Sequence, residues 1–160
     1  MAAFIKFDGV DGECQDKDHK GWSDLGSFSQ VLYRPGGSST GATRRRGDVV
    51  MDDLSCSKEL DKSSPKLAEA VCKGKVFPKV EIHLTASYTD SGRVTYYAYE
   101  LKNVLVTNYS IGGAGQSDSV PMEQFSLNFE EIKVTYTEND NKGKKKGNVE
   151  YSWKVEEGEA

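Results

Sequence analysis

Apolar and polar residues alternate with a period of two along most of the chain. The pattern is clearest at residues 79–87 and 148–156, where every second side chain is apolar. A period of two is typical of a strand with one buried and one solvated face. Four further segments are rich in β-branched and aromatic residues and are also predicted as strands: 4–10, 22–33, 48–56 and 93–109.

The segment 124–137 changes phase partway along. Its apolar residues fall at odd positions up to Phe129 and at even positions from Ile132 onward. A regular strand cannot keep both sets on one face, whereas one extra residue restores the phase. We therefore expect a β-bulge near Glu130 and Glu131, of the kind that bends strands in closed barrels.

One segment has helical features. Ser64 is expected to cap a helix whose first residue is Pro65, and Lys73 with Gly74 is typical of a helix end. An apolar stripe at helical spacing should face the core: Leu67, Ala70 and Val71. The fold class expected is mainly β: a small β-barrel with one short α-helix, as a single domain over residues 1–160.

Composition narrows the class of protein. The 160 residues are 36% hydrophobic and 29% charged, with a net charge of −4. Such a chain has enough apolar residues for a packed core, and its acidity argues against nucleic-acid binding. No apolar run approaches the roughly 20 residues that span a bilayer, and Lys6 interrupts any signal-peptide core. We expect that the protein is synthesised in the cytoplasm and that it does not insert into a membrane.

The search for catalytic or metal-binding motifs yields none. The chain has two histidines, His19 and His83, and neither lies in a nucleophile or zinc motif. Its cysteines are irregularly spaced and are expected to be ordinary thiols: Cys14, Cys56 and Cys72. We expect no catalytic residues, no metal, no cofactor and no enzymatic activity.

A long loop covers residues 34–47. It is rich in Gly and Ser and contains three consecutive arginines, Arg44, Arg45 and Arg46. Structureless loops of this length in compact domains are usually functional or disordered. On an acidic protein, an arginine run without interleaved aromatic residues favours a protein contact over nucleic-acid binding.

Taken in order, motifs along nearly the whole chain resemble the Hcp family (haemolysin-coregulated protein), the tube proteins of bacterial type VI secretion systems. No single motif is diagnostic, but the ordered set is specific. It comprises Phe-Ile-Lys-Phe (4–7), Gly-Val-Asp-Gly-Glu (9–13), Asp-His-Lys-Gly-Trp (18–22), Ser-Phe-Ser (27–29), the helix approach (58–67), the helix exit (74–77), the segment 99–109, Ser-Leu-Asn-Phe (126–129) and Tyr-Ser-Trp (151–153).

The resemblance implies hexameric rings that stack into a tube, with sheath, spike and baseplate proteins as partners and effector proteins carried in the lumen. It implies secretion from the bacterial cytoplasm by the type VI system without a signal peptide. Ser29 is the candidate lumen residue, although Gln30 replaces the tryptophan found there in many members. The loop is the expected ring-stacking or subunit-contact element, with Arg34, Gly36, Gly37, Arg44, Arg45 and Arg46 as its candidate residues.

Two other classes stay open on the residues alone. A ligand-binding β-barrel, carrying a carbohydrate or a lipid, predicts a monomer with a concave apolar pocket. A small hydrolase predicts converging titratable groups with shifted pKa values. A tube subunit predicts a homo-oligomer without such a cluster.

Overall fold

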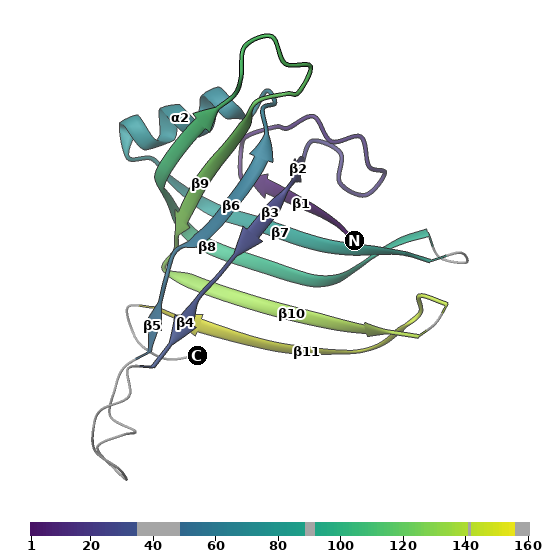
Figure 1. Cartoon of the computed structure of the whole chain (residues 1–160). Helices are drawn as coiled ribbons and strands as arrows, with labels where there is room; N and C mark the ends of the chain where they lie inside the picture. Colours follow the sequence, from purple (N-terminus) through teal and green to yellow (C-terminus); the bar gives the residue numbers. More distant parts are fainter. Residues whose placement is uncertain (35–48, 89–91, 141, 156–160) are drawn as a thin grey trace.

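The computed structural model describes residues 1–34, 49–88, 92–140 and 142–155 (Figure 1). Eleven strands and one helix lie within these ranges. In chain order they are β1 (Ala2–Phe7), β2 (Ser23–Leu25), β3 (Ser27–Ser29), β4 (Leu32–Tyr33), β5 (Val50–Met51), β6 (Leu54–Glu59), α2 (Ser64–Lys73), β7 (Val76–Tyr88), β8 (Gly92–Gly112), β9 (Met122–Asn128), β10 (Glu131–Asn139) and β11 (Lys145–Lys154).

The strands of the main sheet are all antiparallel and wrap around one core. Their order is β2-β1-β7-β8-β9-β6-β3, with β10 paired to β8 and β11 paired to β10. The two ends of this order, β2 and β3, are joined in the chain by Gly26 alone, so the sheet closes on itself as a barrel. Gly26 fits this junction because its N–H donates to the Ser57 carbonyl at 2.8 Å, and a Cβ would lie 3.2 Å from that oxygen.

The expected fold class, mainly β with one helix, is confirmed for the described part of the chain. Two of the predicted strands are interrupted. Residues 22–33 form β2, β3 and β4, and residues 48–56 contain β5 and the start of β6. Alternation alone does not show such breaks, because a strand that moves from one partner to another can keep the same inward and outward phase.

The β-bulge expected at Glu130 and Glu131 is wrong as stated. The chain leaves β9 at Asn128 and enters β10 at Glu131, so the phase changes at a corner between two strands. β9 pairs with β6 and β8, whereas β10 pairs with β8 and β11. A change of partners resets which side chains face inward, which produces the same sequence signal as a bulge.

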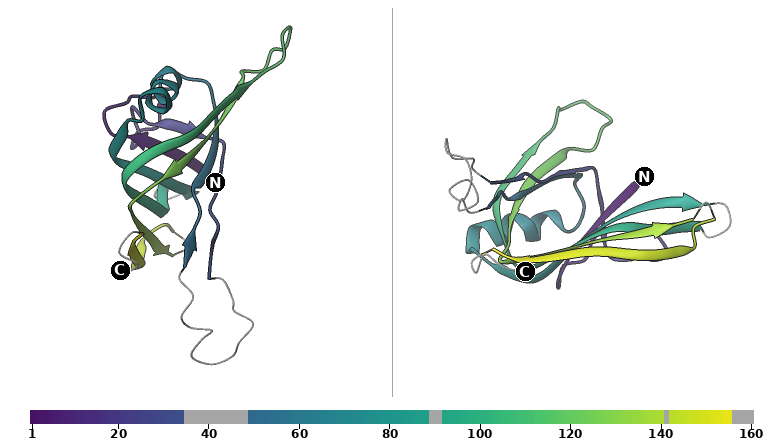
Figure 2. Two further views of the ribbon diagram at one scale, coloured as in Figure 1. Left: turned by 90° about the vertical axis from the view of Figure 1, so that its left-hand side faces the viewer. Right: turned by 90° about the horizontal axis from the view of Figure 1, so that it is seen from below.

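The helix is confirmed, but its N-cap is Ser63 and not Ser64. Neither serine makes a side-chain cap, because the Ser63 hydroxyl donates to Asp61 and the Ser64 hydroxyl accepts the Asp61 N–H at 3.1 Å. The predicted end is confirmed, since Gly74 adopts φ +64°, a left-handed conformation that glycine adopts without strain. Figure 2 shows α2 lying at one end of the molecule.

Candidate functional site

Two adjacent rows on the outward face of four neighbouring strands consist of uncharged polar side chains. One row across β3, β6, β9 and β8 consists of Ser27, Ser57, Gln124 and Ser110, and the next consists of Ser29, Ser55, Ser126 and Asn108. All eight side chains are exposed or half-buried. We call this surface the serine face.

The serine face is hollowed. Its residues line an open depression of about 470 Å³, which also reaches Phe28, Cys56 and Phe125 between the rows. Ser29, the residue expected to lie in the lumen, is one of the eight. Without an ionisable group among these eight side chains, the surface offers hydroxyl and amide hydrogen bonds but no charge for recognition.

A buried ion pair lies on the opposite side of the same strands. Lys58 of β6 and Glu123 of β9 are directly paired in register, both are 0% exposed, and their side chains form an ion pair. Lys58 Nζ also lies 2.8 Å from Asp61, and the Tyr109 hydroxyl donates to Glu123. Such a pair is tolerated in a core only when hydrogen bonds satisfy both charges, so β6 and β9 are fixed in one register.

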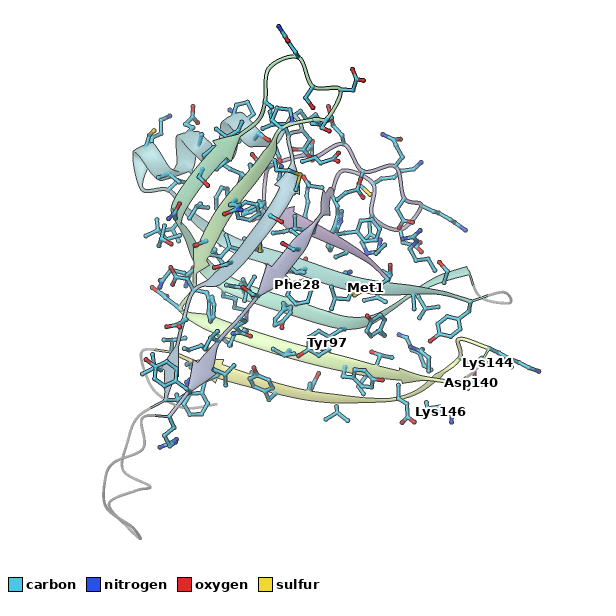
Figure 3. All side chains as sticks on the ribbon, in the orientation of Figure 1. Met1, Phe28, Tyr97, Asp140, Lys144 and Lys146 are labelled. Atoms are coloured by element: carbon cyan, nitrogen blue, oxygen red, sulfur yellow. The ribbon has the colours of Figure 1, made fainter. Side chains whose placement is uncertain are left out.

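The second feature is an extension of the barrel that we call the wing, formed by residues 82–88 of β7, 92–99 of β8, 134–139 of β10 and 145–151 of β11. The four strands continue beyond the edge of β3, as seen in Figure 1. Figure 3 labels Phe28 on β3, Tyr97 on the wing, and Lys144 and Lys146 toward the far end of the wing.

Along the wing, the side of the sheet that faces the core stays apolar, but other parts of the described chain cover it less and less. Three successive rows cross β7, β8, β10 and β11, and exposure rises from the first to the third. In the last row Tyr136 is 45% and Val149 73% exposed. The rows are Val80, Leu101, Ile132 and Trp153; then Ile82, Tyr99, Val134 and Tyr151; then Leu84, Tyr97, Tyr136 and Val149.

The proposed loop is placed only at its first residue. Arg34 follows β4 and is exposed. The other candidates lie outside the described residues: Gly36, Gly37, Arg44, Arg45 and Arg46.

His19 lies in a connection made of polar residues, yet its side chain is buried. His19 is 4% exposed, and its ring stacks on Phe4 with centroids 4.3 Å apart. Its Nε2 lies 3.1 Å from Nδ1 of His83. Within the described ranges, no group of three or more His, Cys, Asp or Glu side chains is placed to hold a metal ion. No helix there is long and apolar enough to cross a bilayer.

Comparison with known proteins gives consistent matches. Residues 4–136 match the sequence model of the family described as "Type VI secretion system effector, Hcp". The chain is 34% identical to "Protein hcp1" of Pseudomonas aeruginosa over 153 residues, which is 95% of this chain and 93% of that protein. This chain belongs to the Hcp family.

Solved structures agree with this assignment. A "type six secretion system protein" superposes with a TM-score of 0.89 at 26% identity, over 99% of this chain and 98% of that one. Hcp1 from Salmonella typhimurium shares the fold, with a TM-score of 0.76 at 22% identity over 99% and 97% of the two chains.

Family membership decides between the function classes. The chain is a type VI secretion tube or effector protein, and this assignment is supported over the ligand-binding β-barrel. Hcp proteins are structural proteins secreted by the type VI system. The signal in the sequence was the ordered set of motifs, because no single residue of the serine face or the wing marks a site.

Proposed function

We propose that this chain is the subunit of a hexameric ring, that the rings stack into the type VI tube, and that the serine face lines the lumen. Residues 1–160 act as a single domain in this assembly. The protein is made in the bacterial cytoplasm and is then secreted by the type VI system. It interacts with sheath, spike and baseplate proteins, and it has no catalytic role.

The observation that carries the lumen assignment is the composition of the serine face. A passage that must release its cargo favours weak contacts, and neutral hydroxyl and amide groups provide hydrogen bonds that exchange readily with water. Effector proteins in the lumen would contact Ser29 and its seven neighbours. The hollow is polar, unlike the apolar pocket that a lipid carrier requires.

The ring contact is proposed at the wing. A closed ring needs two different surfaces on each subunit, which meet head to tail. The apolar side of the wing is one such surface, since its outer row is exposed in the single chain. The loop candidates, Arg34, Gly36, Gly37, Arg44, Arg45 and Arg46, remain the proposed ring-stacking or subunit contacts. Ion pairs there would weaken as salt rises.

Native mass spectrometry of the purified protein tests the ring. The expected result is a dominant species with six times the mass of the chain, visible as annular particles by negative-stain microscopy. A protein that stays monomeric at high concentration, without annular particles, would contradict the proposal.

A further inference from the structure

A second polar cluster lies away from the serine face, where the β1–β2 connection (residues 8–22) packs on the sheet. Its centre is His19, which is enclosed by the ring of Phe4 on one side and the edge of Trp22 on another. The Trp22 ring also contacts His83, with centroids 4.5 Å apart. The two histidines therefore join the connection to β7.

The side chains form a continuous chain of ionisable groups. Asp16 Oδ2 lies 2.7 Å from Nδ1 of His19, and Nε2 of His19 lies 3.1 Å from Nδ1 of His83. At the far end, Nε2 of His83 lies 3.6 Å from Glu81. Two cations flank the chain: Arg93 of β8 lies 3.3 Å from Asp16, and Lys79 of β7 lies 3.1 Å from Glu81.

The contacts that link Asp16, His19, His83 and Glu81 limit how many protons these side chains can hold. A carboxylate only accepts, so Nδ1 of His19 carries a hydrogen, and in neutral His19 the bare Nε2 accepts from His83. One added proton is accommodated, because it places an N–H of His83 toward Glu81. A second added proton puts N–H groups on both His19 Nε2 and His83 Nδ1, and these atoms, 3.1 Å apart, then repel each other.

We propose that His19 and His83 form a pH-sensitive latch, which holds the β1–β2 connection on β7 until both rings are protonated. Protonation of the second ring breaks the bond between the two histidines and releases His19 from its pocket. This opens the turns at Asp16–His19 and His19–Trp22 and exposes the Trp22 ring. The inference rests on the fold of the single chain and stands whether or not rings form.

The surrounding charges set the direction of the response. Burial, and then the charge of His19, lowers the pKa of His83, while Glu81 opposes this shift. The hydrogen bond from His19 holds the pKa of Asp16 below its ordinary value, so Asp16 stays ionised through the range in which histidines titrate. Acidification below neutral pH therefore acts on the latch through its two rings.

Because these are the chain's only two histidines, proton NMR can follow each ring during a pH titration. Coupling predicts that each wild-type ring reports two steps, because two interacting groups share macroscopic pKa values. In His83→Gln, which keeps a neutral donor next to His19, His19 should titrate in one step. Single, independent steps in the wild type would overturn the proposal.

Release of the connection is measured separately by Trp22 fluorescence in a Trp153→Phe background, which leaves Trp22 as the one tryptophan. Between pH 8 and 5 its emission should shift to the red, and hydrogen exchange at the His19 and Trp22 amides should become faster than in His83→Gln at the same pH. The exchange rates of the two proteins should differ about tenfold for each pH unit by which their protonation is displaced. Equal behaviour of both proteins at every pH would refute the latch.

A milder variant keeps the test decisive if His83→Gln folds poorly. Glu81→Gln removes the carboxylate that favours protonated His83, so release should occur at a lower pH than in the wild type. An unchanged pH midpoint of release in Glu81→Gln would count against the proposed latch.

Discussion

The serine face and the wing are both surfaces of the same sheet that no other part of the described chain covers, and both use β8. On the serine face the outward residues are six serines, one asparagine and one glutamine. On the wing the uncovered residues are those that would otherwise face the core, such as Tyr136 and Val149. One surface is suited to transient contact with water or cargo, and the other to permanent burial.

The two regions also differ in what fixes their strands. Under the serine face, β6 and β9 are joined by the ion pair of Lys58 with Glu123. In the wing, β8, β10 and β11 are joined by apolar rows and by tyrosine contacts such as that of Tyr97 on β8 with Tyr136 on β10, whose ring centroids are 6.5 Å apart. The neutral serine face thus lies over a buried ion pair, whereas the apolar side of the wing is continuous with the apolar core.

The largest expected effect comes from removing one member of the buried pair. Glu123→Ala removes the buried partner of Lys58 and leaves Asp61 to compensate its charge, which should lower the free energy of unfolding by about 3–5 kcal/mol. Glu59→Ala, at an exposed position of β6, is the control and should change it by less than about 0.5 kcal/mol. Urea unfolding measures both. Equal values would show that the pair does not fix the serine face.

The next prediction concerns the wing. Tyr136→Glu places a charge in the proposed contact and should cost at least about 2 kcal/mol at each subunit contact, converting rings to monomers. Thr135→Glu, on the polar side of the same strand, should leave the rings intact. Native mass spectrometry distinguishes the two, and rings that survive Tyr136→Glu would remove the wing from the interface.

A pH prediction separates the two regions, since the eight side chains of the serine face are not ionisable and β7 carries His83. The folded state lowers the pKa of His83, so the unfolded chain binds its proton first. Stability is therefore full above about pH 6.5, the ordinary histidine pKa, and declines as pH falls below it.

In this window His83→Gln should lose less stability than the wild type in urea unfolding at pH 5.5. The lowered carboxyl pKa values of Asp16 and Asp61 contribute only at lower pH, because stability from a lowered carboxyl pKa is lost below its ordinary value of 3.8. An identical decline in both proteins would assign the effect to other groups.

The smallest effect is expected on the serine face itself. Ser126→Ala removes one half-buried hydroxyl from the hollow and should change the free energy of unfolding by less than about 0.5 kcal/mol, with rings unchanged. A loss above 1 kcal/mol would mean that this surface is structural.

Sequence patterns predicted the strands because each buries one face, and they predicted Gly74 at the helix end because few other residues adopt its conformation. They did not predict the partner changes at Gly26 and between β9 and β10, which depend on contacts between distant segments. The paired serines at 27 and 29 and at 55 and 57 are visible in the sequence, but the register that aligns them is not.

The buried charges were missed for a related reason. Lys58 continues the inward alternation of Leu54 and Cys56, and Glu123 that of Leu127 and Phe125. Each looks like a solvated end of its strand, and only the pairing of β6 with β9 brings the two charges together. The burial of His19 against Phe4 could not be predicted either, because its neighbours in sequence are polar.

The most direct test of the account asks which way the serine face points in the ring. Ser29→Cys in a Cys72→Ala background is labelled with biotin-maleimide, and binding of streptavidin is measured before and after ring dissociation. Cys14 and Cys56 are buried, and burial raises the pKa of both thiols, so they should react slowly. Cys72 of the wild type, exposed on α2, is the control for an outer position. If the serine face lines the lumen, streptavidin is excluded from the label at position 29 in intact rings and binds it once the rings dissociate. Streptavidin should bind the Cys72 label in both states. Equal binding to both labels in intact rings would contradict the account.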